Sequence, residues 1–175
     1  LGVGKAIAAS GIPRDELYVT TKLWNSDQGT QSAIDAMDLS LEKLGLDHVD
    51  LYLIHWPRAD LDKYLESWQT MESLKEQGKT TSIGVSNFHI PHLERVIGES
   101  GTVPAVDQLE LHPAFAQREL REFAASKGIA IEAWGPLGQG KYGLFGMAPV
   151  AAAAEAHGVS PAQVVVRWHL QSGII

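Results

Sequence analysis

The stretch Val49-Asp50-Leu51-Tyr52-Leu53-Ile54-His55 indicates the class of fold, because its residues alternate between two faces as those of a β-strand do. His55 shares a face with the apolar residues at positions 49, 51 and 53, whereas Tyr52 lies on the opposite face. A helical pattern over residues 31–44, ended by Gly45, precedes the strand. A helix that leads into a strand is therefore the unit from which the rest of the chain can be interpreted.

The same alternation of helical and strand-like patterns extends along the chain in both directions. Because parallel neighbours need a crossover connection, five strands that each lead into a helix predict an α/β fold with a parallel sheet and helices outside it. The expected strands cover residues 17–22, 49–55, 81–86, 105–111 and 129–134. The expected helices cover residues 2–10, 31–44, 61–77, 91–98, 118–127, 149–157 and 161–171, the last with Ser160 as its N-cap and Pro161 as its first residue.

Polar or aromatic residues stand near the C-terminal end of every expected strand, which is typical of the active face of a (β/α)8 barrel. They are Lys22, His55, Ser86, Gln108 and Trp134. A doubly wound sheet would show a glycine-rich first βα turn, which the sequence lacks. A complete barrel takes about 250 residues.

The 175 residues are too few for a complete barrel, so we expect one incomplete TIM-type (β/α)8 barrel domain over residues 1–175. It would hold about strands 3 to 7 and, at residues 173–175, the start of strand 8. The chain begins with Leu1 rather than Met, and we expect it to be truncated at both ends.

Composition narrows the classes of partner. With 14 basic against 21 acidic residues, the net charge of −7 argues against a nucleic-acid-binding surface. The absence of cysteine excludes thiolate catalysis and cysteine-ligated metals. Apolar stretches such as residues 148–154 are far shorter than the roughly 18 residues of a membrane span. We therefore expect a cytoplasmic protein without membrane or nucleic-acid partners, and no pattern sets its oligomeric state.

Five motifs occur in one order along the chain: Thr20–Trp24 (TTKLW), Leu53–Pro57 (LIHWP), Ser82–Asn87 (SIGVSN), Gln108–Pro113 (QLELHP) and Trp134–Lys141 (WGPLGQGK). Over essentially its whole length the chain resembles the aldo-keto reductase family, and its bacterial 2,5-diketo-D-gluconate reductase branch in particular. The resemblance implies a (β/α)8 barrel that uses NADPH without a Rossmann domain. It further implies the reversible reduction of an aldehyde or ketone, with a keto sugar acid as the candidate substrate.

Two candidate catalytic residues follow from this resemblance. Taken alone, Lys22 would be interpreted as a surface lysine and His55 as a structural histidine. In the family, the matching lysine lowers the pKa of a catalytic tyrosine, and the matching histidine donates a hydrogen bond to the substrate carbonyl. The family's catalytic aspartate and tyrosine would precede Leu1, so we expect the chain to lack both and to be inactive alone. None of its four tyrosines has a suitable predicted position: Tyr18, Tyr52, Tyr64 and Tyr142.

The resemblance also assigns cofactor-binding residues. Ser86, Asn87 and Gln108 match positions that bind the nicotinamide carboxamide, and Trp134 matches the aromatic residue that stacks on the nicotinamide ring. The loop that passes over the pyrophosphate corresponds to Gly135, Pro136, Leu137, Gly138 and Gln139. In the family, basic groups that bind the 2′-phosphate follow strand 8, so the preference for NADP over NAD rests on the resemblance alone. Asp107, beside Gln108, is expected to face outward.

Other residues leave alternatives open. Trp24 and Trp56 match the walls of the substrate pocket, although they could instead cap the core of the barrel. His89 and His92 have a metal-like spacing but lack carboxylate or cysteine partners, which favours a solvated loop. Two further hypotheses are a non-catalytic nicotinamide-nucleotide-binding or regulatory barrel module, and an isomerase or lyase in which Lys22 forms a Schiff base.

Overall fold

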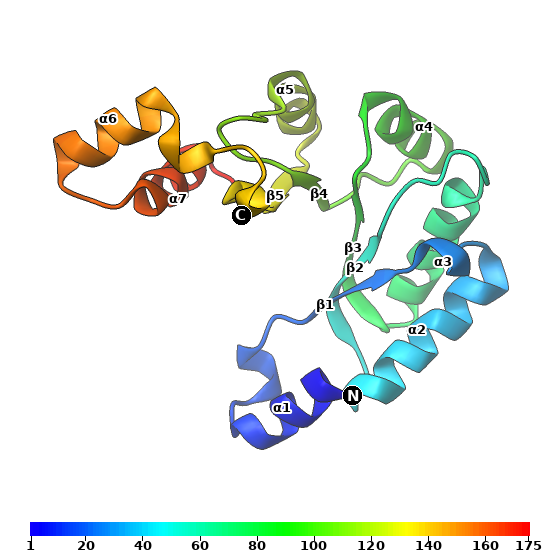
Figure 1. Cartoon of the computed structure of the whole chain (residues 1–175). Helices are drawn as coiled ribbons and strands as arrows, with labels where there is room; N and C mark the ends of the chain where they lie inside the picture. The colour runs from blue at the N-terminus through cyan, green and yellow to red at the C-terminus, as the bar shows by residue number, and fades with distance from the viewer. The chain divides into compact units, whose positions relative to one another are not determined.

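A computed structural model describes all 175 residues, which divide into two compact units, Leu1–Ala105 and Val106–Ile175 (Figure 1). In each unit, strands alternate with helices along the chain, as the sequence predicts. The first unit contains α1 (Gly2–Ser10), β1 (Thr20–Leu23), α2 (Thr30–Leu44), β2 (Val49–Ile54), α3 (Tyr64–Glu76), β3 (Thr80–Ser86) and α4 (Ile90–Ser100). The second contains β4 (Val106–Glu110), α5 (Arg118–Lys127), β5 (Ala130–Trp134), α6 (Ala148–His157) and α7 (Pro161–Gln171).

The sheet of the first unit has the order β1-β2-β3, and its neighbouring strands are parallel. Lys22 pairs with Leu53, which pairs with Gly84, so these positions share one face of the sheet. Side chains of the opposite face are almost inaccessible, and α2 and α3 pack on the sheet. They are Leu23, Tyr52, Ile54, Ile83 and Val85. Tyr52 therefore lies on the face opposite to Lys22, as the alternation predicts.

Helix α2 shows how local sequence and packing agree. It buries Ala33, Met37 and Leu41 as a stripe with helical spacing. Each buried side chain of the size of Met37 contributes about 1.5–3 kcal/mol by leaving water. Gly45 ends the helix in the left-handed conformation (φ 70°), and its amide donates to the carbonyl of Leu41 at 2.8 Å.

The first strand is shorter than the 17–22 predicted and begins at Thr20. The amide of Val19 donates to Oδ2 of Asp50 at 2.7 Å, because this carboxylate reaches across from β2. Arg14 forms a salt bridge with the same oxygen at 2.8 Å. Burial alone would raise the pKa of Asp50, but the Val19 amide and the guanidinium outweigh it and lower the pKa. A side chain thus takes the backbone donor that strand pairing would have used.

Two helix boundaries differ from the sequence prediction by two residues or more. The helix predicted over 61–77 begins at Tyr64, since Asp62 adopts a left-handed backbone (φ 50°) that a helix cannot include. The helix predicted to end at Gly98 retains that glycine and continues to Ser100, before Gly101 (φ 77°). The start of α3 and the end of α4 each lie near a residue with a positive φ, Asp62 in the first case and Gly101 in the second.

In the second unit, β4 and β5 are parallel neighbours, and a small core of Leu144, Val150 and Val165 joins α6 to α7. Helix α7 begins with the predicted cap: the Ser160 hydroxyl accepts from the Gln163 amide, and the Gln163 side chain accepts from the Ser160 amide. Near residue 175 the chain bonds to β5 as a parallel strand would, since the Ile175 amide donates to the Ile131 carbonyl at 3.0 Å. None of the helices is both long and apolar enough to cross a membrane.

Candidate active site

Lys22 is the third residue of β1, and its side chain is half-buried. It shares a sheet face with Leu53, two residues before His55. Its positive charge is the second cause, after burial, that lowers the pKa of His55. The first unit therefore brings together the two residues that the sequence proposed as catalytic.

His55 follows β2 directly and is held on several sides. Its ring stacks on that of Trp24 with centroids 4.6 Å apart, and the ring of Trp56 meets it edge-on at 6.4 Å. Burial, and then the charge of Lys22, lowers the pKa of His55 below its ordinary value. Its Nδ1 is buried and has no hydrogen-bond partner, so Nε2 is the nitrogen left to contact a ligand. The result is an oriented imidazole that stays neutral at neutral pH.

The two tryptophans beside His55 are unusually accessible for their size. Trp24 is 57% exposed and Trp56 is 40% exposed. The backbone of Trp56 is fixed by buried Gln28, whose Nε2 donates to the Trp56 carbonyl at 2.7 Å. Sequence reasoning missed Gln28, and the only available signal was its place in the polar segment after Trp24.

Ser86 and Asn87 lie beside His55 at the end of β3. The Nδ2 of Asn87 donates to the His55 carbonyl at 2.9 Å and to the Ser86 hydroxyl at 3.1 Å. Asn87 has a left-handed backbone (φ 63°), which asparagine tolerates better than most residues. Both side chains are buried, so this turn connects the ends of β2 and β3 through contacts shielded from water.

In the second unit, Gln108 lies in the middle of β4 rather than at its end. Its register neighbour in β5 is Glu132, and Gln108 Nε2 donates to Glu132 Oε1 at 2.8 Å. Trp134 is the last residue of β5, pairs with Glu110 and is half-buried. Asp107 is buried on the other face of β4, as its parity predicts. Glu132 was missed, although it has the same strand parity as Trp134.

The loop after Trp134 has a glycine-rich backbone with several left-handed residues. Gly135, Gly138 and Gln139 all have positive φ values, from 50° to 72°. A Cβ on Gly138 would stand 3.4 Å from the Leu144 side chain, so the loop fits closely there. The carbonyl of Pro136 accepts a hydrogen bond from Nε2 of buried His169 at 3.2 Å, which ties the loop to α7. Leu137 is 39% exposed and lines a hollow of about 330 Å³ within the loop.

A second contact ties this loop to β4 and was not foreseen. The Tyr142 hydroxyl donates to Glu110 at 2.9 Å, and its ring lies 4.5 Å from that of buried His112. The hydrogen bond to Glu110 raises the pKa of Tyr142, so the phenol holds its proton more tightly. The signal available in the sequence was Glu110, which shares strand parity with Gln108.

The two histidines with metal-like spacing form a helix cap. The backbone amide of His89 donates to Nδ1 of His92 at 3.1 Å, at the start of α4. The ring of His92 also packs edge-on against Tyr64 and Phe88. These contacts give the pair a structural role.

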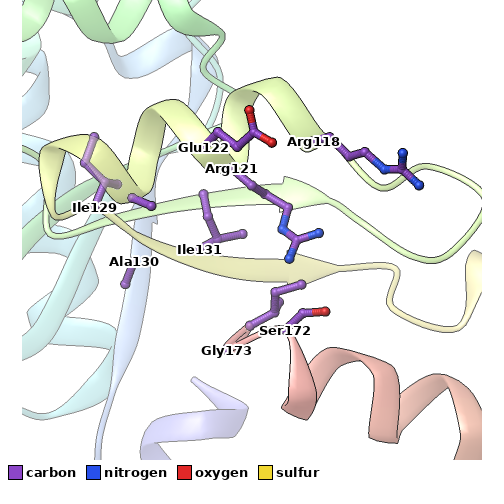
Figure 2. A pocket seen from close by; sticks show the side chains of 10 residues that line it. Arg118, Arg121, Glu122, Ile129, Ala130, Ile131, Ser172 and Gly173 are labelled. Atoms are coloured by element: carbon purple, nitrogen blue, oxygen red, sulfur yellow. The ribbon is translucent and has the colours of Figure 1, made fainter.

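The second unit also has a hollow of about 490 Å³ between α5, the start of β5 and residues 172–174 (Figure 2). Arg118, Arg121 and Glu122 of α5 and Ser172 line it. None of the residues that the sequence proposed for the active site does so. The hollow is therefore separate from the chemistry of the strand ends.

Comparison with known proteins identifies the family. The model of the aldo/keto reductase family matches residues 2–144. The methylglyoxal reductase DkgA of Yersinia pestis is 52% identical over 174 residues, which is 99% of this chain and 62% of that protein. An aldo-keto reductase of Mycolicibacterium smegmatis is 51% identical over 98% of this chain and 62% of its own length. The chain thus spans about three-fifths of the length of these relatives.

Comparison with solved structures indicates the same family. The crystal structure of an aldo/keto reductase from Brucella melitensis has a TM-score of 0.93 and 53% identity, and covers 99% of this chain and 66% of that one. A variant of Gox0644 in complex with NADPH has a TM-score of 0.91 and 46% identity, with 99% and 62% coverage. These matches confirm the predicted family and the predicted α/β fold of an incomplete (β/α)8 barrel.

Proposed function

The chain belongs to the aldo/keto reductase family, and from that premise we propose that it carries part of the active site of an NADPH-dependent carbonyl reductase. The observation that carries the proposal is His55, an imidazole that stacks on Trp24 and whose pKa is lowered by burial and by the charge of Lys22. We also infer that residues 1–175 belong to one barrel domain, as their match to single relatives over 99% of the chain suggests.

The residues present fit a nicotinamide nucleotide. Trp134 offers an aromatic ring, and Gln108 offers an amide next to it in the strand order. The positive φ values of the loop from Gly135 to Gln139 leave backbone amides free of bulky side chains at the glycines, where a pyrophosphate could approach. In the first unit, Ser86 and Asn87 offer polar groups of the kind that bind a carboxamide. The NADPH complex of Gox0644 supports NADP over NAD.

Bound NADPH supplies a hydride to the carbonyl carbon of the substrate. His55 donates an N–H to the carbonyl oxygen, which orients the substrate and stabilises the negative charge that develops on that oxygen. A neutral imidazole serves this purpose because it keeps one donor nitrogen without repelling Lys22. The ammonium of Lys22 favours the ionised form of a nearby phenol and so lowers the pKa of a proton-donating tyrosine.

None of the four tyrosines in the chain suits that proton transfer. Tyr52 lies on the opposite face of the sheet from Lys22, and burial raises its pKa. Tyr18 is 69% exposed before the start of β1, Tyr64 accepts from Arg95 at 3.3 Å, and Tyr142 donates to Glu110. We infer that the proton-donating tyrosine, and the aspartate of the family's tetrad, belong to parts of the longer relatives that these residues do not match.

The relatives and the two tryptophans support a proposal for the substrate class. Relatives from Yersinia pestis and Salmonella typhimurium are named methylglyoxal reductase, and methylglyoxal is a small dicarbonyl. Trp24 and Trp56 offer exposed apolar walls beside His55. We propose a small dicarbonyl or a keto sugar acid as the substrate.

The test measures NADPH fluorescence quenching and NADPH oxidation by methylglyoxal and by 2,5-diketo-D-gluconate. Both the 175-residue chain and the longest natural polypeptide that contains it are assayed. We expect turnover from the longer polypeptide and little from the chain alone. Lys22→Met and His55→Ala should each lower kcat by about 10²–10⁴-fold with little change in NADPH affinity. Lys43→Met, on the exposed surface of α2, is the matched control.

Three other outcomes of these assays would lead to different conclusions. Cofactor binding without turnover in the longer polypeptide would favour a non-catalytic nucleotide-binding or regulatory module. Trapping of a Lys22 imine by borohydride would favour Schiff-base chemistry. Rapid turnover by the 175-residue chain would contradict the inference that the tyrosine and aspartate lie elsewhere.

A further inference from the structure

We propose that Glu132 is a positioning residue that fixes which end of the Gln108 amide faces the cofactor; the inference rests on the proposed function. The two residues are direct register neighbours in β4 and β5 and lie on the same face of that strand pair. Gln108 Nε2 donates to Glu132 Oε1 at 2.8 Å, a good length for a charge-assisted hydrogen bond. Both side chains are half-buried, so the contact is sheltered from water.

The chemistry of the pair determines the orientation of the amide. A carboxylate only accepts hydrogen bonds, whereas a primary amide has a donating NH₂ end and an accepting carbonyl end. Next to Glu132, only the NH₂ end of Gln108 can form a favourable contact, because two oxygens would repel each other. The carbonyl Oε1 of Gln108 is thereby directed away from Glu132. A neutral partner at position 132 would allow both orientations of the amide.

This orientation decides what Gln108 can recognise. An accepting oxygen selects a donor, and the nicotinamide carboxamide has one donor group, its own NH₂. Oε1 is the atom of Gln108 assigned to the carboxamide, where it accepts from the NH₂ end; the second N–H of Nε2 is left for another acceptor. A cofactor in which an acetyl group replaces the carboxamide keeps the carbonyl oxygen but has no N–H, so it lacks the group that Gln108 recognises.

The experiment compares the binding of NADPH with that of its reduced 3-acetylpyridine analogue by titration calorimetry, in the longest natural polypeptide that contains these residues. We expect the wild type to prefer NADPH about tenfold, which corresponds to about 1.4 kcal/mol and to one hydrogen bond. In Glu132→Gln the amide of Gln108 can turn and donate to the acetyl oxygen, so the preference should fall towards one. Most of this change should come from tighter binding of the analogue.

Three further variants separate orientation from structural damage. Glu132→Asp keeps an acceptor-only partner and should retain the preference. Gln108→Met should abolish it, and adding Glu132→Gln to Gln108→Met should change nothing more. Glu122→Gln, on the exposed side of α5, should leave both affinities unchanged. A structural defect would instead weaken the binding of both ligands equally.

The outcomes separate the inference from the proposed function. An unchanged preference in Glu132→Gln, with NADPH bound normally by the wild type, would overturn the role of Glu132 alone. A wild type that binds neither nucleotide would overturn the proposed function, and this inference with it.

Discussion

The strand ends of the two units are held in different ways. In the first unit, side chains bond the backbone directly: Asn87 donates to the His55 carbonyl at 2.9 Å, and Gln28 donates to the Trp56 carbonyl at 2.7 Å. In the second unit, the chain leaves Trp134 into a glycine-rich loop. Two contacts tie this loop to α7 and β4: His169 also bonds a backbone carbonyl, that of Pro136, whereas Tyr142 bonds the side chain of Glu110.

This difference in how the strand ends are held bears on the parts that the two units would take in a reaction. A histidine that must meet a carbonyl oxygen within hydrogen-bond distance benefits from a fixed backbone, because misplacement weakens its contact with the developing charge. A loop that contacts a large nucleotide benefits from contacts that can open and close. The first unit thus holds its histidine through bonds at neighbouring strand ends, and the second holds its loop through contacts with α7 and β4.

The largest expected effect on stability lies at Asp50, which anchors the start of β2 to Val19 and Arg14. Asp50→Asn should lower the free energy of unfolding by about 1.5–3 kcal/mol at pH 7, because a charge-assisted contact is lost. Chemical denaturation at several pH values measures this loss. Asp38→Asn, which breaks the more exposed contact with Lys79, should change little.

The pH dependence of that loss has a definite sign. The folded state lowers the pKa of Asp50 below its unfolded value near 3.9, so its stabilisation is present above that value. The stabilisation disappears as the pH falls through the folded pKa. Wild type and Asp50→Asn should therefore converge in stability at low pH. An equal difference at pH 7 and at pH 2 would argue against the ionic contact.

At the other end of β2, Asn87 bonds the His55 carbonyl, and two variants of Asn87 test this turn. Asn87→Gly removes both hydrogen bonds of the side chain but tolerates φ 63°. Asn87→Ala removes the same bonds and adds left-handed strain, so it should be less stable than the glycine variant by about 1–2 kcal/mol. Thermal or urea denaturation of the pair provides the measurement. Equal stabilities would show that this backbone is less constrained than its geometry indicates.

In the second unit, a smaller perturbation should act on the loop alone. Tyr142→Phe removes the hydrogen bond to Glu110 but keeps the ring beside His112. Cleavage by trypsin after exposed Lys141 should become severalfold faster, whereas the unfolding midpoint should stay nearly constant. Tyr64→Phe, which loses a contact with Arg95 in the first unit, should leave cleavage at this site unchanged. An unaltered cleavage rate in Tyr142→Phe would show that the hydrogen bond to Glu110 does not restrain the loop.

The smallest expected effect is the titration of His55. Burial and the charge of Lys22 lower its pKa below the ordinary value of about 6.5, which NMR of the imidazole nitrogens can measure. Lys22→Met should bring the pKa part of the way back, since burial is the larger cause and remains. Because the unfolded state binds the proton more readily, stability should fall as the pH drops through roughly 6.5. A titration midpoint at or above 6.5 would contradict the buried, neutral imidazole.

Local signals predicted much of the fold. The helices over 118–127 and 161–171 have the predicted bounds, because Gly128 and Ser160 act on the backbone next to them. The start of β1 was misplaced because it depends on Asp50, which lies 31 residues after Val19. Such a boundary is set by a side chain from another strand, which no local pattern contains.

The candidate site likewise contains residues whose placement local patterns predicted and residues that these patterns missed. Alternation along a strand placed Tyr52 opposite Lys22, and this parity follows from backbone geometry alone. The partners Gln28 and Glu132 were missed. Each contacts a residue of another strand or loop, and which residues meet depends on the register between strands.

The sequence by itself determined the family, the parallel α/β pattern and the residue types at the strand ends, because strand alternation and helix caps act over a few residues. Only the tertiary structure decided that His55 is stacked and neutral, that Gln108 meets Glu132, and that Tyr142 ties a loop to β4. These features depend on distances between residues far apart in the chain, which register and packing fix only when the strands are side by side.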